Sequence, residues 1–347
     1  MRHDLLALTA VRVFYWSAKG PSYRRPASCG ACRAKEVWIT ALLLVLFFSS
    51  RALADTFGLG SAGPGNWAIL ETGANQVSFA NQTNITSGSN PSAANLGITS
   101  GGKLNTSGTV TIAGTYYKFS TNSQDNSNST LTINGGTNTA SDSLLTSAAS
   151  AATAAANALS SLSANQSLGT LSASTTINAT IAGRNVISLT GINLNGALLT
   201  LNSNGQSNVS FVINVSGNLN LGSVQLIGGL APKDVIFNVT GPNNNIALGN
   251  ESSGISTDGI FMDINGQVTL TNNNTLNGEI ISGNSISLQN NGDVQAIQTV
   301  PEASTAACFT LGPLTLVAVM LLHKRFSRRK PAVVRASLDP VEASLAP

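Results

Sequence analysis

The stretch Ile264-Asn265-Gly266-Gln267-Val268-Thr269-Leu270 recurs about seventeen residues later as Ile281-Ser282-Gly283-Asn284-Ser285-Ile286-Ser287-Leu288. A similar segment, Val215-Ser216-Gly217-Asn218-Leu219-Asn220-Leu221, lies upstream. Each one ends in a short alternation of apolar and polar residues, which is typical of a half-buried strand. Short strands with Asn and Gly at their corners predict a mostly β protein, a β-solenoid whose coils bury apolar residues against their neighbours. A β-sandwich of similar strands is the alternative.

One segment, residues 141–162, breaks this pattern because it is rich in alanine and contains neither Gly nor Pro. Its apolar residues recur every three or four positions, which predicts a single α-helix with one stripe lying on the sheet. Ser141 or Asp142 can cap its start. A low-complexity linker is the alternative. The stripe consists of Leu144, Ala148, Ala152, Ala155, Leu159 and Leu162.

Residues 1–54 are typical of an export signal with a long basic N-terminal region. A short apolar run over 41–50 precedes Ala52-Leu53-Ala54, a small-x-small cleavage signal. We expect cleavage after Ala54 and an exported domain over residues 55–299. Cys29 and Cys32 fall in the removed segment, so their C-x-x-C spacing is given no redox or metal role.

Residues 300–347 predict a membrane end. The apolar run 303–322 is long enough to form a transmembrane helix. The cations that follow it fix that end in the cytoplasm, with 331–347 as a cytoplasmic tail. A plain single-span anchor is one interpretation of this end. The basic cluster is Lys324, Arg325, Arg328, Arg329 and Lys330.

The order of parts over 300–330 resembles the PEP-CTERM sorting signal of bacterial envelope proteins. The motif residues that match are Val300, Pro301, Glu302, Ser304 and Thr305. Ala303 stands where that family has a second proline, and the chain continues past Lys330, where the family usually ends. The resemblance implies export through the inner membrane and recognition by an exosortase-type sorting peptidase. It implies a final location in the cell envelope, at the cell surface or in the extracellular matrix.

A solenoid with one inserted helix also resembles the choice-of-anchor A family, which is described as an adhesive, collagen-binding-like domain. The likeness implies a non-catalytic adhesive or structural protein, with extracellular polysaccharide or a matrix protein as its ligand. The bacterial ice-binding domain has the same plan of a solenoid with one helix, and this chain resembles it more distantly. Ice binding is therefore the alternative function. The likeness rests on Phe57-Gly58-Leu59-Gly60-Ser61-Ala62, on the helix, and on segments 211–217, 235–239 and 276–283.

Charge and composition exclude several functions for residues 55–299. The basic residues Lys103, Lys118, Arg184 and Lys233 face ten acidic ones, and a net acidic domain is a poor partner for nucleic acid. His3 and His323 lie outside this range, which excludes a Ser-His-Asp triad and a histidine zinc site within it. We therefore expect no enzyme and no cofactor. A carbohydrate-active enzyme, working with carboxylates, is the remaining catalytic alternative.

Two further patterns bear on binding. Asp258 and Asp263 are the nearest pair of acids in residues 250–270, and we expect them to be solvated turn residues on opposite strand faces. Three Thr-x-Thr triplets, 109–111, 130–132 and 269–271, are typical of strands with Thr pointing outward. Stacked threonines on a flat face could order ice, but three isolated copies do not predict an array.

Overall fold

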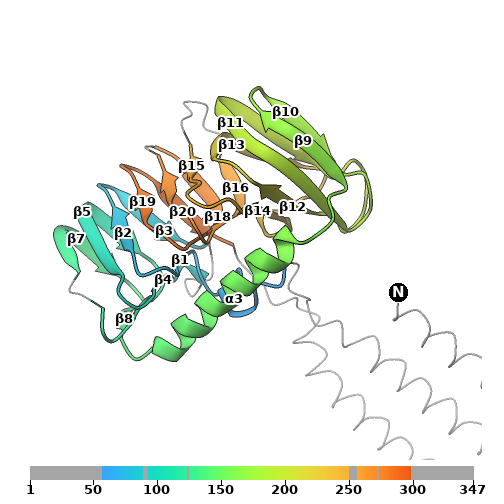
Figure 1. Cartoon of the computed structure of the whole chain (residues 1–347). Coiled ribbons are helices and arrows are strands. Elements are labelled where there is room, and N and C mark those ends of the chain that lie inside the picture. Colours follow the sequence, from blue (N-terminus) through green and yellow to red (C-terminus); the bar gives the residue numbers. More distant parts are fainter. Residues whose placement is uncertain (1–56, 89–92, 123–124, 250–255, 272, 298–347) are drawn as a thin grey trace, which may run out of the picture. The chain divides into compact units, whose positions relative to one another are not determined.

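The computed structural model describes residues 57–88, 93–122, 125–249, 256–271 and 273–297, which lie in one compact unit (Figure 1). The predictions for residues 1–54 and 300–347 lie outside these ranges. No helix within the described ranges is long and apolar enough to cross a membrane.

Parallel strands wind into coils, and each coil passes in turn through three sheets, so the predicted solenoid and its high strand content are confirmed (Figure 1). We name the first the helix-side sheet, because the helix lies along it. In spatial order its strands are β9 (Gln166–Leu171), β11 (Arg184–Asn202), β12 (Ser210–Val215), β14 (Val235–Val239), β16 (Thr257–Asp263), β18 (Thr275–Ser282), β1 (Ile69–Glu71), β4 (Leu96–Ile98), β6 (Tyr116–Lys118) and β8 (Thr137–Asn138).

The next sheet along each coil is the polar sheet. It is built from the middle of β11 followed by β13 (Leu219–Ile227), β15 (Ile246–Leu248), β17 (Val268–Leu270), β19 (Ile286–Leu288), β2 (Gln76–Phe79), β5 (Lys103–Ile112) and β7 (Asn126–Ile133). The third sheet contains β10 (Thr175–Asn178), β20 (Asp293–Ala296) and β3 (Thr83–Thr86), completed by the other parts of the long strands.

The spatial order of the coils differs from their order in the sequence. β1 lies between β18 and β4, so the first coils of the domain stack directly on the last ones. From there the chain winds to one end of the stack at β7 and β8, and it resumes at the opposite end with β9 and β10. The winding from β9 then returns to the middle.

Successive coils also differ in length. The side-chain contacts that join Asn218, Asn245, Gln267 and Ser285 span 27, 22 and 18 residues. The repeat of about seventeen residues expected from the sequence therefore describes only the last of these steps. The additional residues lie in turns, among them 228–234 between β13 and β14.

The helix α3 (Asp142–Ser160) connects the two ends of the stack by running along the helix-side sheet (Figure 1). It is the one α-helix of the described residues, and it confirms the helix expected over 141–162. Its buried stripe contains Leu145 in place of Leu144, which is 42% exposed. Ser141 makes no capping hydrogen bond, and the Asp142 carboxylate accepts hydrogen bonds from Ser120 instead.

Apolar side chains form two clusters on opposite sides of the helix-side sheet. The inner cluster fills the coils and includes Phe211, Phe237 and Phe261, all with 0% exposure. The outer cluster packs α3 on the sheet and includes Phe57, Leu159 and Ile297. Burial on both sides explains the nearly continuous apolar sequences of strands such as β12 and β14.

Candidate functional site

The outward surface of the polar sheet is the candidate site, and we call it the uncharged face. Most of its strands share one pattern, in which a small side chain stands between two buried apolar ones, as in Val268-Thr269-Leu270. At one end the pattern changes, because Asn105 lies between Leu104 and Thr106, and Asn126 follows Asp125. Because side chains alternate across a strand, the middle residue points outward. The register aligns these middle residues in one row: Asn193, Asn220, Ala247, Thr269, Ser287, Ser78, Asn105 and Asn126.

A second row runs beside the first, two positions earlier in the chain, where most of the strands have not yet begun. It comprises Asn218, Asn245, Gln267, Ser285 and Gln76, and it ends at Lys103. Apart from Lys103, neither row contains an ionisable side chain. Neighbouring strands in a sheet lie about 4.8 Å apart, so eight positions extend over roughly 34 Å.

Hydrogen bonds from coil to coil hold this face in place. The Asn218 side-chain oxygen accepts the backbone N–H of Asn245 at 2.9 Å, and the Asn245 side chain accepts that of Gln267 at 3.3 Å. Asn105 donates to the Gln76 side chain at 2.8 Å. From Asn193 to Asn105, the buried residues on either side of each outward residue fix the backbone beneath it. The face is therefore a rigid and repetitive array of small neutral groups.

The third sheet has a different surface. Thr109 and Thr111 pair with Thr130 and Thr132, so two of the three Thr-x-Thr triplets are stacked. Our expectation of three isolated copies was wrong for these two, because residues 109 and 130 lie on adjacent coils. The third triplet belongs to the polar sheet, where Thr269 stands in the central row.

Acidic residues interrupt the third sheet. The Asp293 carboxylate accepts hydrogen bonds from the backbone and side chain of Asn84. The Asp258 carboxylate accepts them from Ser256 at 3.0 Å and from Asn277 at 2.8 Å. Burial raises the pKa of Asp258, while these two hydrogen bonds lower it. Ionised groups hold their own hydration shells, so this surface is a less regular template for water than the uncharged face.

Three other acids are fully buried at the helix-side sheet: Glu71, Asp263 and Glu279. Burial raises the pKa of Asp263 to about 6, with the backbone N–H groups of Asn265 and Gly266 acting in the opposite direction. The expectation that Asp263 is a solvated turn residue was wrong, because its coil corner is covered. Asp258 and Asp263 belong to different sheets, and the described residues contain no group of three potential metal ligands.

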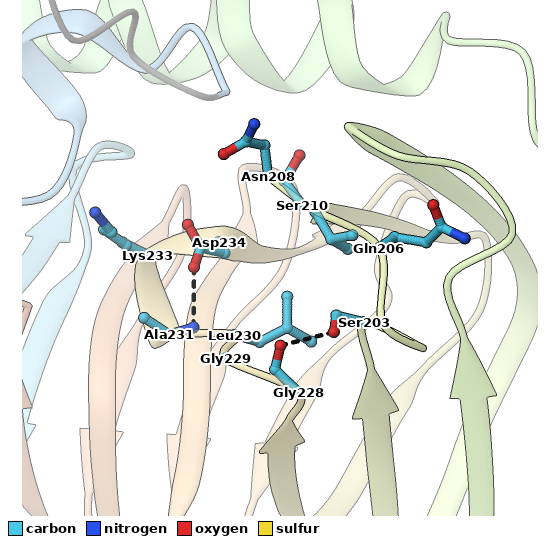
Figure 2. Close-up of a pocket in the computed structure, with 11 residues that line it drawn as sticks. Ser203, Gln206, Asn208, Ser210, Gly228, Gly229, Leu230, Ala231, Lys233 and Asp234 are labelled. Carbon is cyan, nitrogen blue, oxygen red and sulfur yellow. Dashed lines mark hydrogen bonds between the residues drawn. The ribbon is translucent and has the colours of Figure 1, made fainter.

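A pocket of about 430 Å³ lies at the corner where the third sheet passes into the helix-side sheet (Figure 2). It is lined by the turn 203–210 between β11 and β12 and the turn 228–234 between β13 and β14. Ser203 donates to the Gly228 carbonyl oxygen, and Asp234 accepts from the Ala231 backbone (Figure 2). This corner is separate from the polar sheet, so the pocket has no part in the uncharged face.

A family model described as Ice-binding-like matches residues 79–256, more than half of the chain. Similar solved structures include an ice binding protein from an Antarctic Biological Consortium, with 18% identity, a TM-score of 0.46 and coverage of 70% of this chain and 91% of that one. Another is from the ascomycete Antarctomyces psychrotrophicus, with 19% identity, a TM-score of 0.43 and coverage of 70% and 98%. No curated protein matches this chain in sequence.

The chain forms a parallel β-solenoid whose first coil lies in the middle of the stack, and one helix packs along one side. This fold defines the class of the protein as a β-solenoid with one added helix. The chain belongs to the Ice-binding-like family. This match corrects the adhesive or structural role expected from the sequence, and it favours the alternative, ice binding. The polysaccharide or matrix-protein ligand that accompanied the adhesive role stays a prediction.

The sequence interpretation missed the central row of the uncharged face. The signal was present in the triplets Leu219-Asn220-Leu221, Val268-Thr269-Leu270 and Ile286-Ser287-Leu288. Each has a small polar residue between two large apolar ones, but only the strand register shows that these residues stack. The sorting motif, the basic cluster and the cleavage site at Ala52 and Ala54 lie outside the described residues.

Proposed function

We propose that the protein binds ice through the uncharged face. The observation that carries this proposal is the row of eight aligned, neutral and mostly small side chains between Asn193 and Asn126. Membership of the Ice-binding-like family supports it.

The physical basis is a match between two repeating surfaces. An ice crystal presents water at regular intervals, so a binding face must hold many waters in fixed positions at once. Hydroxyl and amide groups on rigid strands about 4.8 Å apart can hold such waters without strong local hydration. A contact made by many weak groups also needs backbone that is ordered beforehand, because ordering it upon binding would weaken the association.

The test compares two matched substitutions in the purified protein. Thr269→Lys places a long, hydrated cation in the central row, whereas Thr132→Lys places the same group on the third sheet, where Thr132 is exposed. We expect Thr269→Lys to abolish adsorption to a growing ice surface and Thr132→Lys to retain it. The reverse result would assign ice binding to the third sheet, and no adsorption by the unmodified protein would exclude the function.

We also propose that the protein is exported, non-catalytic and free of cofactors. The cleavage signal at Ala52 and Ala54, the PEP-CTERM-like motif at 300–305 and the apolar run 303–322 support export and recognition by an exosortase-type peptidase. Detection of the protein outside the inner membrane of its native cell would test this location.

A further inference from the structure

The two ends of the described chain lie on the same side of the solenoid. Phe57, at the start, is 4% exposed, and Ile297, at the end, is 8% exposed. Both side chains belong to the cluster that packs α3 against the helix-side sheet. Residues that are 240 positions apart in numbering therefore share one apolar cluster.

The position of Ile297 within its coil can be stated more closely. Ala296, the last residue of β20 in the third sheet, pairs with Gly278 of β18. At the next residue, Glu279, β18 enters the helix-side sheet and pairs with Ile260. Ile297 thus lies at the corner between the third and helix-side sheets. In a coil with three sides, that corner is opposite the polar sheet.

The position along the stack matters as well. β18 and β1 are interior strands of the helix-side sheet, with further coils on both sides. Five residues, 298–302, separate Ile297 from the apolar run that begins at 303. At no more than about 3.6 Å per residue, this link reaches roughly 20 Å. If the chain is attached to a membrane at residue 303, the middle coils of the stack therefore stay close to that membrane, on the side where Ile297 lies.

We propose that the protein, as long as its C-terminal apolar segment is uncleaved and holds it in the membrane, turns α3 toward the membrane and presents the whole uncharged face outward. The inference rests on the proposed function, which supplies the partner for that face, namely an ice surface. Attachment near the middle of the stack keeps all eight positions of the central row accessible together. In this tethered, uncleaved form the protein would hold a membrane or cell on ice.

The orientation is tested by energy transfer in vesicles that contain the full chain and an acceptor dye in the lipid. The natural cysteines Cys29, Cys32 and Cys308 are replaced by serine, and a donor dye is attached to one new cysteine. Ser150→Cys labels the exposed side of α3, and Ser287→Cys labels the central row. A helix about 10 Å wide and a sheet separation of about 10 Å place the second site roughly 20 Å further from the lipid.

We expect clearly stronger transfer from the label at 150 than from the label at 287. Equal transfer, stronger transfer from 287, or a chain that does not remain with the vesicles would overturn the inference. Circular dichroism of both labelled chains checks that the strands are intact.

A second measurement separates this inference from the proposed function. Vesicles carrying the unlabelled full chain should adsorb to ice, and vesicles carrying Thr269→Lys should not. If protein released from the vesicles by protease adsorbs to ice but the vesicles do not, the presentation is wrong and ice binding stands. If neither adsorbs while the energy transfer is as expected, the orientation stands and ice binding is wrong.

Discussion

Phe237 and Phe261 stack inside adjacent coils with their ring centroids 4.7 Å apart and their planes 3° from parallel. They come from paired positions of β14 and β16, so the strand register itself brings the rings face to face. Gly259 lies against this stack, since a Cβ there would stand 3.4 Å from the Phe237 ring. The two rings link neighbouring coils through the interior of the solenoid.

Phe237→Ala should lower the free energy of unfolding by about 3–5 kcal/mol, because it removes a fully buried ring and leaves a cavity beside Phe261. Denaturant unfolding followed by circular dichroism measures the change. The control is Thr269→Ala, at an outward position, which should cost under about 1 kcal/mol. Similar losses from both variants would contradict the assignment of inside and outside.

Leu159→Asp should detach α3, because it places a charge in the buried cluster between helix and sheet. We expect increased binding of a hydrophobic dye while the β signal in circular dichroism is retained. Leu144→Asp is the matched control, since Leu144 is on the same helix and is 42% exposed. An unchanged dye signal in Leu159→Asp would show that the helix contributes little to the fold.

Asp263 should make stability depend on pH. Its pKa is about 6 in the folded protein against an ordinary value of 3.8, so folding favours the protonated acid. Its stabilising contribution is present below 3.8 and is lost as the pH rises through about 6. At 1.36 kcal/mol per pKa unit, the loss is on the order of 3 kcal/mol.

Asp263→Asn tests this contribution, because the neutral amide keeps an oxygen that can accept the Asn265 backbone N–H. Unfolding measured between pH 4 and 7 should show a smaller loss of stability in this variant. A remaining slope of the same sign is expected, because burial also raises the pKa values of Glu71 and Asp258. An identical slope in the two proteins would contradict the assignment to Asp263.

Processing at the sorting motif provides a prediction outside the folded domain. If an exosortase-type peptidase recognises Pro301 and Glu302, the mature protein should lose its C-terminal end near residue 302. Mass spectrometry of protein from the native cell should then find no peptide from residues 331–347. Abundant peptides from that tail would favour a plain membrane anchor.

The sequence allowed the solenoid and its helix to be predicted because both depend on local patterns. Short alternations of apolar and polar residues identified strands, and the three-to-four spacing of apolar residues over 141–162 identified α3. The sequence patterns failed where the position of a neighbouring element decides which side chain is buried. Leu144 and Leu145 both fit a helical stripe, and only the position of the sheet selects Leu145.

The candidate site was harder to predict, because it consists of pairings between distant residues. Ser287 and Ser78 are neighbours in the central row although 209 positions separate them. No repeat in the sequence indicates this contact, because Ser78 lies in the first coils of the domain and Ser287 in the last. The coil that contains Ser78 stacks on these last coils on one side and on the coil that follows it in the sequence on the other. The stacking of Thr109 on Thr130 was missed for a different reason, because these residues lie 21 positions apart on consecutive coils and the expected repeat of about seventeen residues does not align them.

The first coil of the domain lies in the middle of the stack, and this position affects how the chain folds. Thr72 bonds to Ser282, 210 residues later, so one edge of β1 has no partner until nearly the whole domain has been synthesised. Such distant pairings form slowly, and an unpaired strand edge is a template for another chain. A chain shortened before β18 would keep that edge open permanently. The nascent protein is therefore vulnerable to aggregation until its last coils arrive.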